Sequence, residues 1–138
     1  LLLDLFEATH GCDWTNNDNW LTDDDYCNWQ GVTCTQDTTS QGFEITEINL
    51  SNNNLVGSIP SSIGGLFNVV QLDVSKNSVY GVIPTNLGLL TSLEVLSLSE
   101  NSYNNPANSN TGIMPTEVCD NFTPNGNLVA ITADCAHP

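Results

Sequence analysis

One pattern of side chains occurs twice in succession: ITEINLSNNNLVGSIPSSIGGLFN at residues 45–68 and VVQLDVSKNSVYGVIPTNLGLLTS at residues 69–92. The period is 24 residues, and ten apolar, Asn, Gly and Pro positions coincide at this offset. Repetition at such a period is typical of solenoids, in which each repeat stacks on its neighbours. We therefore expect consecutive coils that share one apolar core. The coinciding positions are Ile45, Ile48, Leu50, Asn53, Leu55, Gly57, Ile59, Pro60, Ile63 and Leu66 in the first stretch, and Val69, Leu72, Val74, Asn77, Val79, Gly81, Ile83, Pro84, Leu87 and Leu90 in the second.

The first part of each repeat alternates apolar with polar residues, which predicts a strand with one buried face. Equivalent strands should stack into a parallel sheet. Asn53, Asn77 and Asn101 fall at the turns that follow these strands. Their side-chain amides can bond the backbone groups that the strands leave unpaired. Pro60 and Pro84 suit the convex side, where a fixed φ is needed and a missing N–H is tolerated.

The pattern starts a third time at Leu93 and is then interrupted. Fourteen positions separate Asn101 from Pro115, whereas seven separate the equivalent Asn and Pro of each earlier repeat. Residues 104–110, NNPANSN, are therefore interpreted as an insertion. Insertions in repeat proteins map to loops on one face, and loops often carry binding residues.

The spacing after Pro115 predicts a terminal half-repeat instead of a full coil. Its last strand should contain Leu128 and Ile131. Cys119 and Cys135 would then lie on successive coils, and a bond between them could close this end of the solenoid.

The residues before the first repeat predict a cap. Residues 2–10, LLDLFEATH, have the pattern of a short amphipathic helix, which Gly11 can end in the left-handed conformation. The side chains of Trp14, Trp20 and Trp29 are too large to leave in water. We expect them to cover the open end of the apolar core.

Charge restricts the possible partners. The chain has 16 Asp and Glu residues against one basic residue, Lys76, and its formal net charge is −15. Nucleic acids and anionic membrane surfaces both attract clustered Lys and Arg, so both are excluded as partners. We interpret the carboxylates as a coat that resists aggregation. Loose binding of Ca²⁺ at the surface is the alternative, and no other cofactor is expected. Asp23, Asp24 and Asp25 are interpreted as a solvated turn, with a cation site as the alternative.

The cysteines indicate an oxidising compartment. Four of the five bracket the repeats in two pairs, which suggests disulfides in a secreted or lumenal protein. Cys12 is left over, either as a buried free thiol or as a link to another chain. No run of about 18 apolar residues occurs, so no membrane span is expected. The start Leu1-Leu2-Leu3 lacks the features of a signal peptide, and we expect a mature or trimmed chain.

Two motifs carry a family resemblance. The stretch CNWQGVTC at residues 27–34 resembles the C-x-W-x-G-V-x-C element in the N-terminal cap of plant-type leucine-rich repeat proteins. The Gly-x-Ile-Pro elements at 57–60 and 81–84 resemble the plant-specific form of the repeat. The similarity extends from about residue 3 to residue 135. Within this family, the chain is similar to receptor-kinase ectodomains, polygalacturonase-inhibiting proteins, antifreeze proteins and short secreted proteins of algae.

The resemblance implies an α/β solenoid: a short arc with a parallel β-sheet on the concave face and an irregular or 3-10 convex side. It implies a helical N-terminal cap closed by a Cys27–Cys34 disulfide. A disulfide over so short a loop contributes roughly 2–3 kcal/mol in the chain-entropy model. The C-terminal cap is expected to be disulfide-bonded as well, because of the positions of Cys119 and Cys135. The expected division is a cap at 1–44, three repeats at 45–115 and a capping half-repeat at 116–138.

No convergent acid, base or nucleophile is evident, because neither His10 nor His137 has a plausible Ser or Cys partner. We therefore expect no enzyme. The resemblance implies an extracellular or lumenal module that binds a protein, peptide or glycan through the sheet face or the 104–110 loop. The alternatives are a structural subunit of a surface assembly, matrix or larger complex, and, ranked last, an ice-binding protein. The candidate binding residues are Glu47, Asn49, Gln71, Asp73, Glu94 and Ser97 on the sheet face, where Ser51 and Ser75 also point outward, with Tyr80 and Tyr103 beside the sheet as aromatic anchors.

Two sequons for N-linked glycosylation occur, Asn49-Leu50-Ser51 and Asn121-Phe122-Thr123. A glycan on Asn49 would stand on the concave face and would obstruct binding there.

Overall fold

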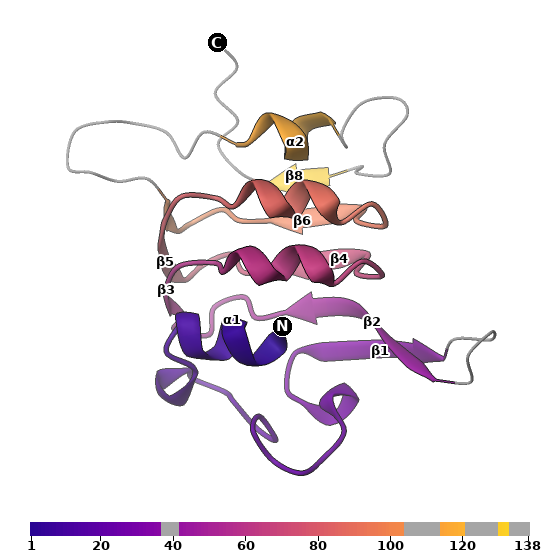
Figure 1. The fold of residues 1–138 in the computed structure, drawn as a ribbon. Coiled ribbons are helices and arrows are strands. Elements are labelled where there is room, and N and C mark those ends of the chain that lie inside the picture. The colour runs from indigo at the N-terminus through magenta and orange to yellow at the C-terminus, as the bar shows by residue number, and fades with distance from the viewer. Residues whose placement is uncertain (37–41, 104–113, 121–129, 133–138) are drawn as a thin grey trace.

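The computed structural model describes residues 1–36, 42–103, 114–120 and 130–132. Short strands and helical turns alternate along the chain and build stacked coils (Figure 1). The elements, in order, are α1 (Leu2–Ala8), η1 (Gly11–Asp13), η2 (Tyr26–Asn28), β1 (Val32–Gln36), β2 (Phe43–Asn49), β3 (Val56–Gly57), η3 (Ser61–Gly65), β4 (Gln71–Asp73), β5 (Ser78–Gly81), η4 (Thr85–Leu89), β6 (Val95–Ser97), β7 (Ser102–Tyr103), α2 (Thr116–Cys119) and β8 (Ala130–Thr132), where η denotes a 3-10 helix.

The main sheet has the strand order β1-β2-β4-β6-β8 (Figure 1). Its strands β2, β4, β6 and β8 are parallel, and their register places Ile48, Leu72, Leu96 and Ile131 in one row. The side chains of Ile48, Leu72 and Leu96 are at most 1% exposed. Fully burying such a side chain stabilises the fold by roughly 1.5–3 kcal/mol. The predicted stack of coils around one apolar core is thus confirmed.

The opposite side of the coils is a column of helical segments, α1, η3, η4 and α2 (Figure 1). Pro60 and Pro84 immediately precede η3 and η4, with φ of −74° and −69°. The proline ring fixes φ near these values and suits a helix start, where no N–H is needed. The prediction of a 3-10 side with proline at fixed φ is confirmed.

A second parallel sheet, with the order β3-β5-β7, was missed by the sequence reasoning. Its strands are two to four residues long, too short for alternation to be recognised. The end of α1 covers its first strand. The N–H of Val56 donates to Thr9 O at 3.2 Å, and the N–H of Ser58 donates to Ala8 O at 3.3 Å. The cap therefore protects a strand edge that would otherwise be open for pairing.

Asparagine side chains join successive coils. Asn77 Oδ1 accepts from the N–H groups of Asn53 and Leu55 at 2.9 and 3.0 Å, and Asn77 Nδ2 donates to Leu50 O and Val74 O, both at 2.9 Å. Asn101 repeats this arrangement one coil later: its Oδ1 accepts from the Val79 N–H, and its Nδ2 donates to Val74 O. The predicted role of these amides is confirmed.

The N-terminal end of the core is covered by aromatic rings. Phe6 lies 5.1 Å from Trp14 and 5.4 Å from Trp20, and Trp20 lies 4.8 Å from Trp29, measured between ring centroids. Trp14 and Trp20 are buried, whereas Trp29 is partly buried. The tryptophans thus occupy the predicted position at the end of the core.

The end of the first helix differs from the prediction. The helix stops at Ala8, and His10, not Gly11, adopts the left-handed conformation, with φ of 54°. Gly11 is required for a different reason: a Cβ atom there would collide with the ring of Phe6. The His10 ring compensates for its unfavourable backbone conformation with a 2.6 Å hydrogen bond between Nδ1 and Val56 O.

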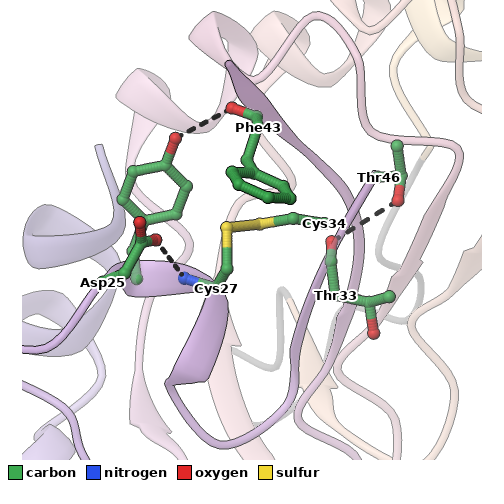
Figure 2. Close-up of a disulfide and its surroundings, with 7 residues drawn as sticks. Asp25, Cys27, Thr33, Cys34, Phe43 and Thr46 are labelled. Carbon is green, nitrogen blue, oxygen red and sulfur yellow. Dashed lines mark hydrogen bonds between the residues drawn. A yellow bond between two sulfur atoms is a disulfide. The ribbon is translucent and has the colours of Figure 1, made fainter. Parts of the chain in front are cut away.

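A disulfide joins Cys27 to Cys34, as the resemblance implied (Figure 2). It ties η2 to β1, which pairs antiparallel with β2 and forms the edge of the main sheet. Asp25 fixes the start of η2, because its Oδ1 accepts from the Cys27 N–H at 2.9 Å (Figure 2). This hairpin completes the cap over the first coil.

Cys12 is a free thiol and is exposed, so the expectation of a buried thiol is wrong. Gly11 packs against Phe6 and is buried, which leaves the next residue at the surface. Several sequence predictions lie outside the described residues: the insertion at 104–110, the sequon at Asn121, and Cys135 with its pairing to Cys119. The three-part division also stays a prediction, and β2 runs across its boundary at residue 44.

We predict that Asn77→Ala lowers the free energy of unfolding by about 3 kcal/mol. The substitution removes bonds to two coils and leaves buried backbone groups unsatisfied. Urea denaturation followed by circular dichroism would measure the loss. Asn68→Ala is the control, because Asn68 is exposed and should change stability by no more than about 0.5 kcal/mol. Equal stability of the two variants would contradict the structural role of Asn77.

Candidate functional site

The outer face of the main sheet holds most of the candidate binding residues. Glu47 and Asn49 lie on β2, opposite Gln71 and Asp73 on β4. Ser97 on β6 lies opposite Asp73 and continues that row. Parallel strands hold such neighbours at spacings near 4.8 Å. The structure therefore brings these five residues together on one rigid surface, as the sequence predicted.

Glu94 adjoins this surface, immediately before the first residue of β6. It is exposed, and its backbone links neighbouring coils: its N–H donates to Val70 O at 2.8 Å, and its carbonyl accepts from the Ala130 N–H at 3.0 Å. The side chain is therefore carried on a well-anchored backbone at the rim of the sheet.

Two of the candidate side chains also stabilise turns. Asn49 Oδ1 accepts from the N–H and the hydroxyl of Ser51, at 3.1 and 2.8 Å. Asp73 Oδ1 accepts from the N–H and the hydroxyl of Ser75, at 2.9 and 2.7 Å. Ser75 is consequently buried, so its expected outward position is wrong, whereas Ser51 is partly exposed. Asp73 keeps a second carboxylate oxygen for other contacts.

The electrostatic character of the face is acidic. Glu47, Asp73 and Glu94 carry negative charge, and the one lysine of the chain, Lys76, lies at the following turn. Lys76 forms an exposed ion pair with Glu100, 3.9 Å between Nζ and Oε1, and solvent screens such a pair strongly. The surface is therefore suited to a cationic group.

The two tyrosines proposed as anchors lie on the second sheet and do not join this face. Tyr80 on β5 is 50% exposed and lies opposite Ser102. Tyr103 on β7 packs against the core, and its buried hydroxyl has no hydrogen-bond partner among the described residues. Burial raises the pKa of the Tyr103 hydroxyl well above that of a free tyrosine. The eight candidate residues therefore do not form a single surface.

A shallow hollow beside the cap was not predicted. It has a volume of about 220 Å³ and is lined by Tyr26, Phe43 and Phe67, all three of which are exposed. The hydroxyl of Tyr26 donates to Phe43 O at 3.0 Å (Figure 2). The sequence gives no signal for this hollow, because it does not distinguish exposed aromatic residues from buried ones.

A metal centre is not evident in the part of the chain that the structure describes. No group of three or more His, Cys, Asp or Glu side chains is arranged there to hold an ion. Asp23, Asp24 and Asp25 are exposed, and Asp25 caps η2. The exposure of the three side chains and the capping bond of Asp25 favour a solvated turn over a cation site. Within the same residues, no helix is long and apolar enough to cross a membrane.

Comparison with known proteins supports the family resemblance. The family model "Leucine Rich Repeat" matches residues 44–66. Comparison with curated protein sequences found no match. Among solved structures, the chain resembles the BIR2 ectodomain from Arabidopsis thaliana, with a TM-score of 0.63 and 28% identity. That match covers 74% of this chain and 54% of the other.

Two further structures from Arabidopsis thaliana are similar. The ectodomain of the membrane receptor kinase GASSHO1/SCHENGEN3, solved in complex with Casparian strip integrity factor 2, matches with a TM-score of 0.53 and 42% identity, over 57% of this chain and 9% of that one. The BIR3–SERK2 complex matches with a TM-score of 0.62 and 24% identity, over 86% of this chain and 60% of that one. The chain thus spans less than two thirds of the length of each of these three structures.

We predict that Tyr103 keeps its proton in the folded state at a pH where unfolded tyrosine, with a pKa of about 10, has lost it. Its contribution to stability is therefore intact below about pH 10 and declines as the pH rises above that value. Alkaline titration of tyrosinate absorbance would test this with Tyr103→Phe. In the folded state the variant and the wild type should show the same rise in tyrosinate absorbance. In denaturant the rise of the variant should be smaller by the signal of one of the three tyrosines. An equal loss in the folded state would contradict the prediction.

Proposed function

Because the chain is a leucine-rich repeat protein of the plant type, we propose that it is a non-catalytic extracellular interaction module. The outer face of the main sheet binds a Lys- or Arg-rich segment of a partner protein or peptide. The observation that carries the proposal is the row of polar and acidic side chains on neighbouring parallel strands, from Glu47 and Asn49 through Gln71 and Asp73 to Ser97.

The rigidity of the face supports binding. Each side chain of the row is carried on a strand whose backbone is bonded to the next coil, so little ordering is needed when a partner arrives. Rigid surfaces bind with a smaller loss of conformational entropy. The 104–110 loop is the second part of the binding surface in this proposal, since loops inserted in repeats often contact ligands.

The charge of the face supports a basic partner. Glu47, Asp73 and Glu94 are not balanced by any Lys or Arg on the sheet, because the chain has a single basic residue, Lys76. None of the residues in the row from Glu47 to Ser97 is aromatic, whereas aromatic anchors dominate tight interfaces. Binding through such a surface gains speed and selectivity from electrostatic attraction and weakens as salt is added.

The comparisons support the same class of function. The GASSHO1/SCHENGEN3 ectodomain, which shares 42% identity with the matched part of this chain, was solved with a bound partner. The matched part is only 9% of that ectodomain. The partner of this chain therefore has to be argued from its own residues.

The sheet-face proposal predicts that neutralising Glu47→Gln, Asp73→Asn and Glu94→Gln together weakens binding about tenfold. Three surface charges, two of them exposed and that of Asp73 partly buried, at about 0.5 kcal/mol each give this factor. Asn can replace Asp73 without loss of the turn, because Asn49 makes the same bonds in the preceding coil. The measurement is calorimetry of the purified chain against a panel of synthetic Lys- and Arg-rich peptides.

A matched control removes the same charge elsewhere. Glu7→Gln, Asp23→Asn and Asp24→Asn are exposed substitutions in the cap, away from the sheet face. This control variant should bind nearly as well as the wild type. Equal weakening of both variants, or no binding of any basic peptide, would contradict the proposal.

A second candidate function, that of a subunit in a covalent assembly, is favoured by the exposed free thiol of Cys12. It predicts a disulfide-linked dimer of native protein that reductant and Cys12→Ser both abolish, measured by intact mass. A monomer under oxidising conditions would exclude this link. Ice binding is not proposed, because the aligned positions Asn49, Asp73, Ser97 and Thr132 carry four different side chains, whereas ice needs a regular array.

A further inference from the structure

The end of β2 carries a feature that binding of a basic segment does not explain. Asn49 is the last residue of β2, it is exposed on the main sheet face, and it begins the sequon Asn49-Leu50-Ser51. The equivalent residue of the next coil is Asp73, which cannot accept a glycan. We infer that Asn49 carries an N-linked glycan, and that this glycan shields the cap end of the sheet face. The inference rests on the extracellular location in the proposed function.

The side-chain amide of Asn49 has its two ends in different environments. Oδ1 is engaged by the N–H and hydroxyl of Ser51, at 3.1 and 2.8 Å. Within the described residues, Nδ2 has no hydrogen-bond partner. A substituent on Nδ2 therefore breaks none of these bonds, and the turn at the end of β2 stays as it is. The three asparagines at the turns of the repeats differ: Nδ2 of Asn53, Asn77 and Asn101 donates to backbone carbonyls.

The surroundings leave room for a bulky group. The Asn49 N–H donates to Gly31 O at 2.7 Å, so the neighbour on the cap side is a glycine, which has no side chain. Gly31 has φ of 83°, and a Cβ there would collide with Asn49 O, so this position must stay small. Asp73 is the neighbour on the other side. The crowding that a sugar would meet between two long side chains is therefore absent.

The turn by itself does not require asparagine. Asp73 and Ser75 make the same pair of bonds as Asn49 and Ser51, at 2.9 and 2.7 Å. A carboxylate would thus serve the structure equally well at position 49. The amide nitrogen is the chemical difference between the two coils, and it is the atom to which a glycan attaches.

The chemistry of the modification is a group transfer. The donor is an oligosaccharide linked through a diphosphate to a lipid. A bond forms between Nδ2 of Asn49 and C1 of the first sugar, the bond between C1 and the phosphate oxygen breaks, and one amide proton is released. The lipid diphosphate is the leaving group.

A glycan at this position changes which residues a partner can reach. Glu47 lies on the same strand and face, two residues before Asn49, so the glycan would block a partner from reaching it. Asp73, Glu94 and Ser97, which lie further from the cap, would stay accessible. The modified protein should therefore use the part of the sheet beyond β2 for binding.

The test is direct because of the chain's single lysine. Reduced protein, secreted by a eukaryotic cell and digested with trypsin, divides after Lys76 into residues 1–76, with Asn49, and residues 77–138, with Asn121. An amidase that releases N-linked glycans should lower the mass of the first fragment and leave Asp at position 49. Fragment 1–76 of unmodified mass in the secreted wild type would overturn the inference.

Variants separate the sequon from the fold. Asn49→Gln and Ser51→Ala should each abolish the glycan on fragment 1–76, whereas Ser51→Thr, which keeps the hydroxyl and the sequon, should retain it. A glycan that persists on Ser51→Ala would show that the modification lies elsewhere and would also overturn the inference. The readout is a mass, so it does not depend on whether any basic peptide binds the sheet.

Discussion

The structure depends on hydrogen bonds that asparagine side chains make between one coil and the next. Asn77 bonds backbone groups of its own coil, through Val74 O, and of the preceding coil, through Leu50 O and the Asn53 N–H. A buried backbone group without a partner costs about 1–3 kcal/mol, so these amides make a tight turn compatible with burial. They also fix the position of one coil relative to the next, and hence the register in which the side chains of the main sheet are aligned.

The series of amides ends on the cap. Asn53 Oδ1 accepts from the Asn16 N–H at 2.7 Å, and Asn53 Nδ2 donates to Asn16 O at 2.9 Å. The first coil therefore meets in the cap the same kind of partner that later coils find in their neighbours. This contact satisfies the polar groups of the first coil, and Phe6 and the three tryptophans exclude water from its apolar core. The first coil therefore needs no further coil before it.

Much of this architecture could be predicted from the sequence, because it is repeated there. Ile48, Leu72 and Leu96 are aligned in the structure as the period of 24 residues indicated. Features that occur only once in the chain were harder to predict from the sequence. His10 takes the left-handed conformation because its ring bonds Val56 O, a contact across 46 positions that no local pattern shows. The second sheet was missed because its strands are too short to produce a period.

The candidate site was predictable only to the extent that the register defines it. Alternation placed Glu47, Asn49, Gln71 and Asp73 on one face, and they lie there. Alternation could not show that Ser75 is drawn inward by Asp73, nor that Tyr103 is packed against the core while Tyr80 is exposed. Exposure of a single side chain depends on neighbours that are distant in the sequence.

The way coils are joined has a consequence for the length of the arc. The groups that residues 69–92 offer to the following coil are equivalent to those that the preceding coil offers to residues 69–92. Coils of this kind interact with nearest neighbours alone. An added copy of residues 69–92 would meet complementary surfaces above and below, and neither end of the protein would need rebuilding. The number of coils is thus a quantity that evolution or an engineer can change in whole steps, and the span of the acidic face would change with it.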